Sequence, residues 1–87
     1  MTDQSEKTVL EKSRDIISQL KEMRHYSKAN IEKLTEMWLI LDSEMNHKEF
    51  ARRVEELNSH QNAFHGAIES LISDYEIECN RMENEAS

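Results

Sequence analysis

An unbroken heptad pattern runs from residue 10 to residue 41, and it limits the possible fold more than any other feature of the chain. One set of seam positions is Leu10, Ile17, Arg24, Ile31 and Trp38, and the other is Ser13, Leu20, Ser27, Leu34 and Leu41. Alternating steps of three and four residues keep both sets on one side of a helix. The chain contains one Gly and no Pro, and this scarcity favours a few long helices with very short connections.

Local signals indicate where two helices begin and end. Thr8 and Glu11 match a capping box, in which the Thr hydroxyl accepts a backbone N–H and the Glu side chain reaches back to the cap residue. Asn46 and Glu49 repeat this spacing, so a second helix is expected to begin at residue 47. We therefore predict one helical domain over 1–87, with a disordered N-terminus at 1–7, helices at 8–42 and 47–81, a turn at 43–46 and a frayed acidic tail at 82–87.

The second predicted helix has its own heptad, formed by Phe50, Val54, Leu57, Gln61, Phe64, Ile68, Leu71, Tyr75, Glu78 and Met82. A connection of about four residues makes neighbouring helices antiparallel. Folding the chain about this turn is expected to place Ile17 opposite Tyr75 and Gln61 near Ile31. The sequence thus predicts an all-α, long antiparallel two-helix hairpin that resembles a coiled coil. The alternative is a three-helix bundle with a break near Ser27–Asn30, where capping residues occur.

Apolar residues also lie beside the seams, and they make the apolar stripe wider than one neighbouring helix can cover. They are Val9, Ile16, Met23, Met37, Ile40, Ala63, Ile72 and Ile77. We therefore expect the hairpin to complete a four-helix bundle, either by dimerisation or with the helices of a partner.

Residues 37–41 are five consecutive apolar residues, which cover the whole circumference of a helix. A neighbouring helix covers only one side of them, so the rest is expected to bind another chain. The predicted partner-binding residues are Met37, Trp38, Leu39, Ile40, Leu41 and Phe50. The alternative is a well-packed hairpin end with a single exposed Leu39.

Three small residues, Ala63, Gly66 and Ala67, form a candidate close-packing site on the second helix. Gly inside a helix costs up to about 1 kcal/mol relative to Ala. Small side chains here would let another backbone or a bulky side chain approach closely. The alternative is that Gly66 simply accommodates Tyr26 or Met23 of the same chain.

Charge and motif content argue against several classes of function. The net charge is −7, from 18 acidic and 11 basic residues, and no basic stripe for nucleic acid is visible. The longest apolar run is too short to cross a bilayer. Glu22 and His25 have the spacing of a di-iron motif but lie off the seam, and no second copy exists. The single Cys79 lies beside acidic residues, which do not activate a thiol.

We therefore expect no enzyme activity, no catalytic residue, no metal and no cofactor. A protein partner, a homo-oligomer or both are expected, without nucleic-acid binding or membrane insertion. The expected location is cytoplasmic, with leaderless export as the alternative.

In outline, the chain resembles small leaderless helical hairpins of bacterial secretion systems. These are the WXG100-like type VII substrates with their helical partners, and the small co-chaperones of type III secretion needles. Trp38 lies near the end of the first helix, as in the type VII group, whereas Ile40 occupies the place of that group's Gly. The resemblance implies a component or chaperone of a secretion system.

Four functional hypotheses follow from these observations. The leading one is a small acidic interaction module (an adaptor, chaperone or assembly subunit) that binds a helical partner through an apolar patch near the turn. The alternatives are a structural homodimer, a secretion-system component or chaperone, and a regulator that binds a transcription or signalling protein.

Overall fold

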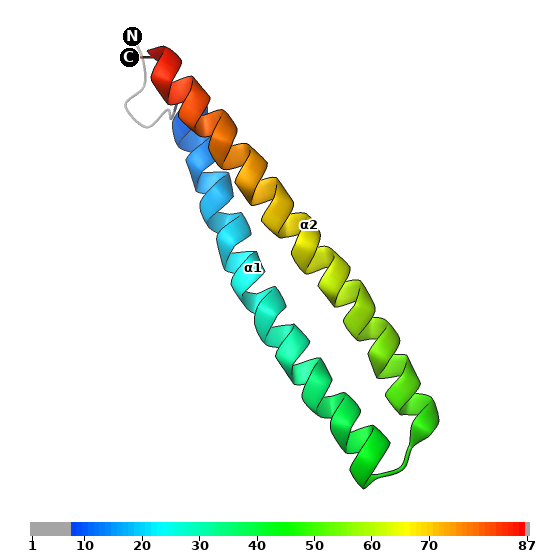
Figure 1. Cartoon of the computed structure of the whole chain (residues 1–87). Helices are drawn as coiled ribbons and strands as arrows, with labels where there is room; N and C mark the ends of the chain where they lie inside the picture. Colours follow the sequence, from blue (N-terminus) through cyan, green and yellow to red (C-terminus); the bar gives the residue numbers. More distant parts are fainter. Residues whose placement is uncertain (1–7, 87) are drawn as a thin grey trace.

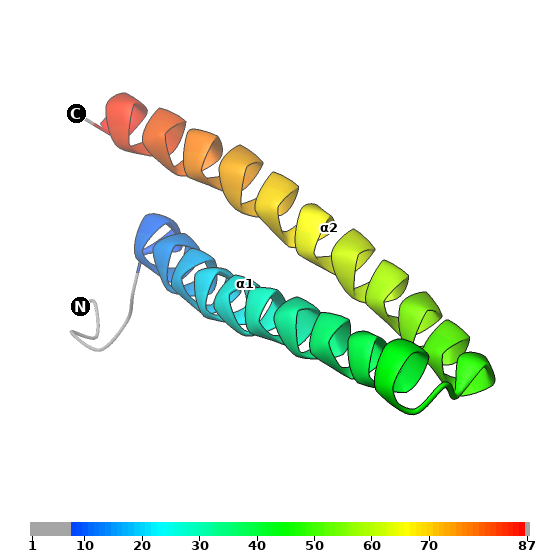
Figure 2. The ribbon, with the colours of Figure 1, turned by 60° about the horizontal axis from the view of Figure 1, so that its bottom comes forward.

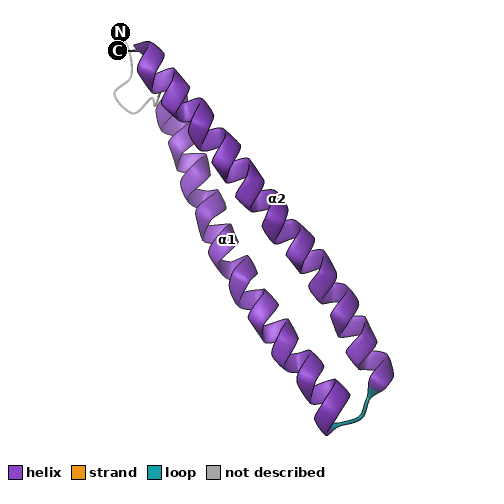
Figure 3. Cartoon of the chain, viewed as in Figure 1, coloured by secondary structure: helices purple, strands orange, loops and turns teal. Residues whose placement is uncertain are grey.

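The computed structural model describes residues 8–86, apart from the side chain of Ala86, and contains two long helices that lie side by side (Figure 1). Helix α1 spans Val9–Leu39, the short π-helix η1 spans Ile40–Glu44, and helix α2 spans Lys48–Ala86. The two long helices run in opposite directions in both Figure 1 and Figure 2. Only a short loop joins them (Figure 3). Over the described residues the chain is therefore the all-helical hairpin that the heptads predict.

Helix α1 is continuous through residues 27–30, so the three-helix alternative is wrong. Its start is the predicted capping box: Glu11 N donates to Thr8 Oγ1 and Thr8 N donates to Glu11 Oε1, both at 3.1 Å. Ser27 does not cap a new helix because its hydroxyl instead accepts a hydrogen bond from the Gln61 amide of α2 at 2.9 Å. A side chain held by tertiary contacts no longer competes for the local backbone.

The turn differs in detail from the predicted segment 43–46. Helix α1 widens into η1, where Met45 N bonds to the carbonyl oxygen of Ile40 at 2.9 Å. Asn46, the predicted cap of the second helix, has a φ of 52°, whereas a cap residue is normally extended. Asn tolerates this left-handed conformation well, so it reverses the chain, and α2 begins at Lys48.

Helix α2 extends five residues beyond the predicted end at residue 81 and reaches Ala86. Ion pairs on the last turns explain the extension, because Arg81 bonds to Glu78 and Glu85 at 2.5 Å each. Arg14 of α1 also pairs with Glu83. The prediction for residues 1–7 lies outside the described part of the chain.

The seam of α1 is the predicted one, since all of its positions are buried or half-buried. The seam of α2 is only half correct. The predicted residues Val54, Gln61, Ile68, Tyr75 and Met82 face α1, but their predicted companions Phe50, Leu57, Phe64 and Leu71 are exposed. The positions that do face α1 are Ala51, Asn58, His65, Ile72 and Cys79. Helix α2 is therefore rotated about its axis from the predicted orientation.

The register along the helices is also shifted by about one turn. Tyr75 Oη bonds to Ser13 Oγ at 2.8 Å, rather than lying opposite Ile17. Gln61 likewise bonds to Ser27 instead of lying near Ile31. The shift follows from the turn, because His47 N donates to the carbonyl oxygen of Leu41 at 2.7 Å. This bond brings the start of α2 back alongside Leu41.

The buried apolar cluster lies in the half of the hairpin away from the turn. It comprises Ile17, Ile68, Ile72 and Cys79, with Leu10, Leu20, Tyr75 and Met82 packed against it. The middle of the seam is polar by contrast, with Ser27 and Gln61 joined by their hydrogen bond. The hairpin is a single layer of helices with principal extents of 66 × 23 × 13 Å, so one seam is all that it can bury.

The rotated seam can be tested with two isoleucines of α2. Ile72 is 2% exposed and Ile77 is 64% exposed. We expect Ile72→Ala to lower the free energy of unfolding by about 2–5 kcal/mol, because it leaves a cavity. Ile77→Ala, the matched control, should change it by about 0.5 kcal/mol or less. Urea unfolding followed by circular dichroism measures both, and equal losses would contradict the assigned seam.

Candidate protein-binding face

Most exposed large apolar side chains lie on one face of the hairpin. Four of them on α1, at residues 9, 16, 23 and 37, are separated by seven or fourteen residues. Four more on α2, at residues 50, 57, 64 and 71, are separated by seven. Each of the eight directly precedes a seam position. With Tyr26 and Ile40 they form a set that we term the apolar face: Val9, Ile16, Met23, Tyr26, Met37, Ile40, Phe50, Leu57, Phe64 and Leu71. Each of these side chains is between 43% and 72% exposed. Only Leu39, Met45 and Ile77 are exposed large apolar residues outside this set within the described chain.

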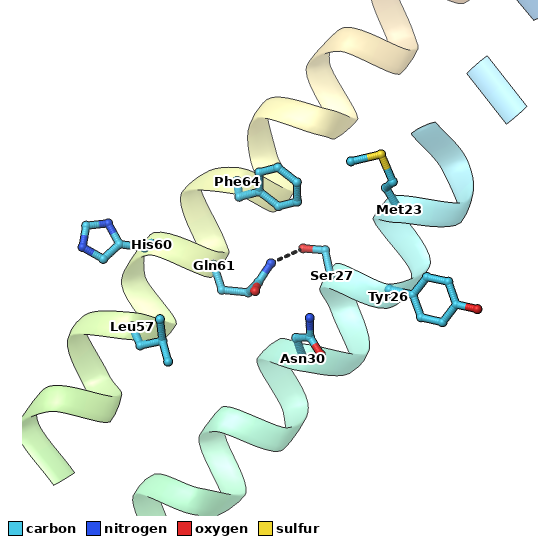
Figure 4. Close-up of a pocket in the computed structure, with 8 residues that line it drawn as sticks. All are labelled: Met23, Tyr26, Ser27, Asn30, Leu57, His60, Gln61 and Phe64. Carbon is cyan, nitrogen blue, oxygen red and sulfur yellow. Dashed lines mark hydrogen bonds between the residues drawn. The ribbon is translucent and has the colours of Figure 1, made fainter. Parts of the chain in front are cut away.

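A groove between the helices shows that the two stripes share one side of the hairpin. It is lined by Met23, Tyr26, Ser27 and Asn30 of α1 and by Leu57, His60, Gln61 and Phe64 of α2. Figure 4 shows the Ser27–Gln61 hydrogen bond crossing the groove, with Tyr26 and His60 on its outer flanks. Apolar side chains of both helices therefore border one shallow depression whose floor is a polar pair.

The opposite side of the hairpin is charged and complementary. Lys21 Nζ lies 2.8 Å from Glu76 Oε2, and Arg14 pairs with Glu83. The hydrogen bond from Lys21 lowers the pKa of Glu76 below its usual value. Lys28 and Glu69 lie one heptad closer to the turn than Lys21 and Glu76, and they line a common groove on this side. These pairs are largely exposed and individually weak. They nevertheless give the charged side chains on this side oppositely charged partners within the same chain.

The charged side explains the rotation of α2. Basic residues recur at 14, 21 and 28, and acidic residues at 69, 76 and 83, all seven apart. These positions meet only if Ile72 and Cys79, rather than Leu71 and Glu78, point at α1. The predicted seam would also have buried the Glu78 carboxylate, which is costly. In the structure the buried residue is Cys79, at 0% exposed.

The predicted partner-binding residues divide into three groups. Met37, Ile40 and Phe50 belong to the apolar face. Trp38 and Leu41 are half-buried at seam positions. Leu39 is exposed but lies outside the apolar face, on the far side of Trp38. The apolar face extends well beyond this segment, and Leu57, Phe64 and Leu71 were missed because the sequence reading assigned them to the seam.

The small-residue site has no counterpart within the chain. A Cβ placed on Gly66 would meet nothing within 4 Å, so the interpretation that Gly66 accommodates Tyr26 or Met23 is wrong. Ala63 and Ala67 are exposed as well. The orientation of α2 about its axis explains this, because residues 63, 66 and 67 point away from the α1 seam. Close packing of this site against another molecule stays a prediction.

The remaining chemistry of the described residues is sparse. Within 8–86, no three His, Cys, Asp or Glu side chains gather where they could hold a metal ion. None of the described helices has a stretch long and apolar enough to span a lipid bilayer. Comparison with protein-family models, curated proteins and solved structures finds no similar protein. Functional inference therefore depends on the geometry of the two faces.

The open surroundings of Gly66 generate a stability prediction. We expect Gly66→Ala to raise the free energy of unfolding by about 0.5–1 kcal/mol, since Ala is the better helix former and finds free space. The neighbouring exposed Ala67→Gly should lower it by a similar amount. Both are measured by thermal and urea unfolding. A loss of stability in Gly66→Ala would instead show that another molecule packs closely there.

Proposed function

We propose that this chain is a small acidic protein–protein interaction module, an adaptor, chaperone or assembly subunit, whose apolar face binds the helices of a partner. The observation that carries the proposal is the segregation of exposed apolar side chains onto one side of a single-layer hairpin. Exposed apolar side chains gathered on one side of a molecule are typical of an interaction site.

The geometry of the apolar face supports a helical partner in particular. Its side chains follow the heptad spacing of α1 and α2 and border a shallow groove along the helices. A helix laid along such a groove can insert its own side chains between those of the hairpin. Helix-in-groove recognition uses residues spaced three, four and seven apart, which is the spacing present here.

The proposal differs from the sequence-based expectation in where the contact is made. The expected patch was confined to residues near the turn, whereas the proposed surface extends from Phe50 near the turn to Leu71, beyond the middle of α2, and to Val9 at the open end of α1. Its centre is the groove at Met23, Leu57 and Phe64. Residues at the centre of an interface usually contribute most to affinity.

Two neighbouring apolar residues provide a matched test. Ile40 is 45% exposed on the apolar face, and Leu39 is 49% exposed outside it. We expect Ile40→Asp to weaken partner binding by roughly tenfold or more, because it places a charge in an apolar interface. Leu39→Asp should leave binding within about threefold of the wild type. Affinity capture with the tagged full chain, followed by titration of the captured partner, measures both.

A stronger central variant accompanies that pair. Phe64→Asp should abolish capture, and Ser59→Asp, an exposed position of α2 away from the apolar face, should not. Circular dichroism must show unchanged helicity in each variant. If all four variants retain the same partners with the same affinity, the apolar face is not the binding surface.

A further inference from the structure

We propose that a second copy of this chain covers the apolar face, in a two-fold arrangement that places the turn of one copy beside the open end of the other. We term this arrangement the antiparallel dimer. It rests on the proposed function, because it names the partner of the same face. The result would be a four-helix bundle in which each hairpin supplies one layer.

The extent of the apolar face fits a partner with helices as long as those of the hairpin itself. The face runs from residue 9 to residue 40 along α1 and η1 and from residue 50 to residue 71 along α2, which is about 45 Å and about 30 Å of helix at 1.5 Å per residue. Apolar side chains occur near the turn, at the centre and near the open end. A second copy covers all of them at once, whereas a short peptide helix would leave most of them in water.

The spacing on α2 is self-complementary about the centre of the face. Leu57 and Leu71 lie seven residues before and after Phe64. A two-fold axis across the helices near Phe64 stacks α2 on α2 of the second copy, in opposite directions. Leu57 of each copy then meets Leu71 of the other, and Phe64 lies near its own symmetry mate. The matching is confined to this central stretch, because Phe50 falls opposite Glu78 of the other copy. An isologous interface requires this kind of self-matching.

The same axis pairs two charges of opposite sign. Arg53 lies eleven residues before Phe64 and Asp74 ten residues after it, and both occupy the heptad position of His60, on the outer flank of α2. Among the described residues the structure gives neither of them an oppositely charged partner. Arg53 is placed over the Phe50 ring, 5.5 Å from its centroid. In the antiparallel dimer, Arg53 of each copy lies beside Asp74 of the other.

The other two-fold arrangement, in which both turns lie at one end, lacks the contact between Arg53 and Asp74 of the other copy. That arrangement stacks α1 on α2 of the second copy at the same level. Lys33, on the outer flank of α1, would then face Arg53 of the other copy, and Lys12, at the same heptad position, would lie near its Asp74. The first contact is repulsive and the second attractive, so they offset each other.

The first test measures the mass of the full chain in solution and the effect of charge-reversing variants on dimer dissociation. Sedimentation or light scattering should give twice the chain mass of 10.3 kDa. Arg53→Glu and Asp74→Lys should each raise the dissociation constant by roughly tenfold, because two attractive pairs become repulsive. The double variant should return it to within about threefold of the wild type. Arg52→Glu, at the adjacent position outside the apolar face, is the matched control and should leave it unchanged.

Cysteine cross-linking tests the orientation of the two copies. With Cys79 replaced by Ala, Tyr26→Cys should form a disulfide-linked dimer under mild oxidation, because Tyr26 lies close to the level of the axis. Ile40→Cys has the same heptad position two heptads further towards the turn and should not. Efficient linkage through Ile40→Cys, or none through either, would overturn the antiparallel arrangement.

The outcomes separate this inference from the proposed function. A folded monomer at every concentration, with partner capture still abolished by Phe64→Asp, overturns self-association and leaves a different protein as the occupant of the face. A dimer that Phe64→Asp does not weaken overturns the assignment of the apolar face as its interface. If Phe64→Asp affects neither self-association nor capture, both proposals are wrong.

Discussion

The packing of α1 against α2 along a single seam is the interaction on which the rest of the structure depends. Two helices laid side by side share one line of contact, and every side chain off that line stays accessible. The identity of the residues on the line therefore decides what the remaining surface looks like. With Ile72 and Cys79 in the seam, the apolar side chains of Leu57, Phe64 and Leu71 are left outside.

This choice of seam divides the hairpin into two unlike sides. On one side, Arg14 and Lys21 pair with Glu83 and Glu76. Such ion pairs remain solvated, so this side needs no further covering. The other side gathers the apolar face, including Met23 and Phe64 around the central groove. A chain this thin gains little from its own core, so covering the apolar side with further helices adds the second layer that most helical domains possess.

The fold was predictable from the sequence to a large extent, and the binding face only in part. The heptad of α1 and the Thr8–Glu11 capping box were both correct because they depend on local periodicity and local hydrogen bonds. The seam of α2 was half wrong because apolar size alone was used to choose between two stripes that flank Val54 and Ile68. Three acidic residues at seven-residue spacing carried the missing signal, but only in combination with basic residues of the other helix.

The sequence by itself determined that this chain forms two long helices joined by a short turn, since helix length, capping and heptad spacing are properties of neighbouring residues. It also determined that there is more apolar surface than one seam can bury. Only the tertiary structure decided which stripe of α2 turns inward and the one-turn register that joins Ser27 to Gln61. Rotation and register are set by contacts between residues far apart in the chain, where charge pairing, the turn geometry and the cost of burying Glu78 all act together.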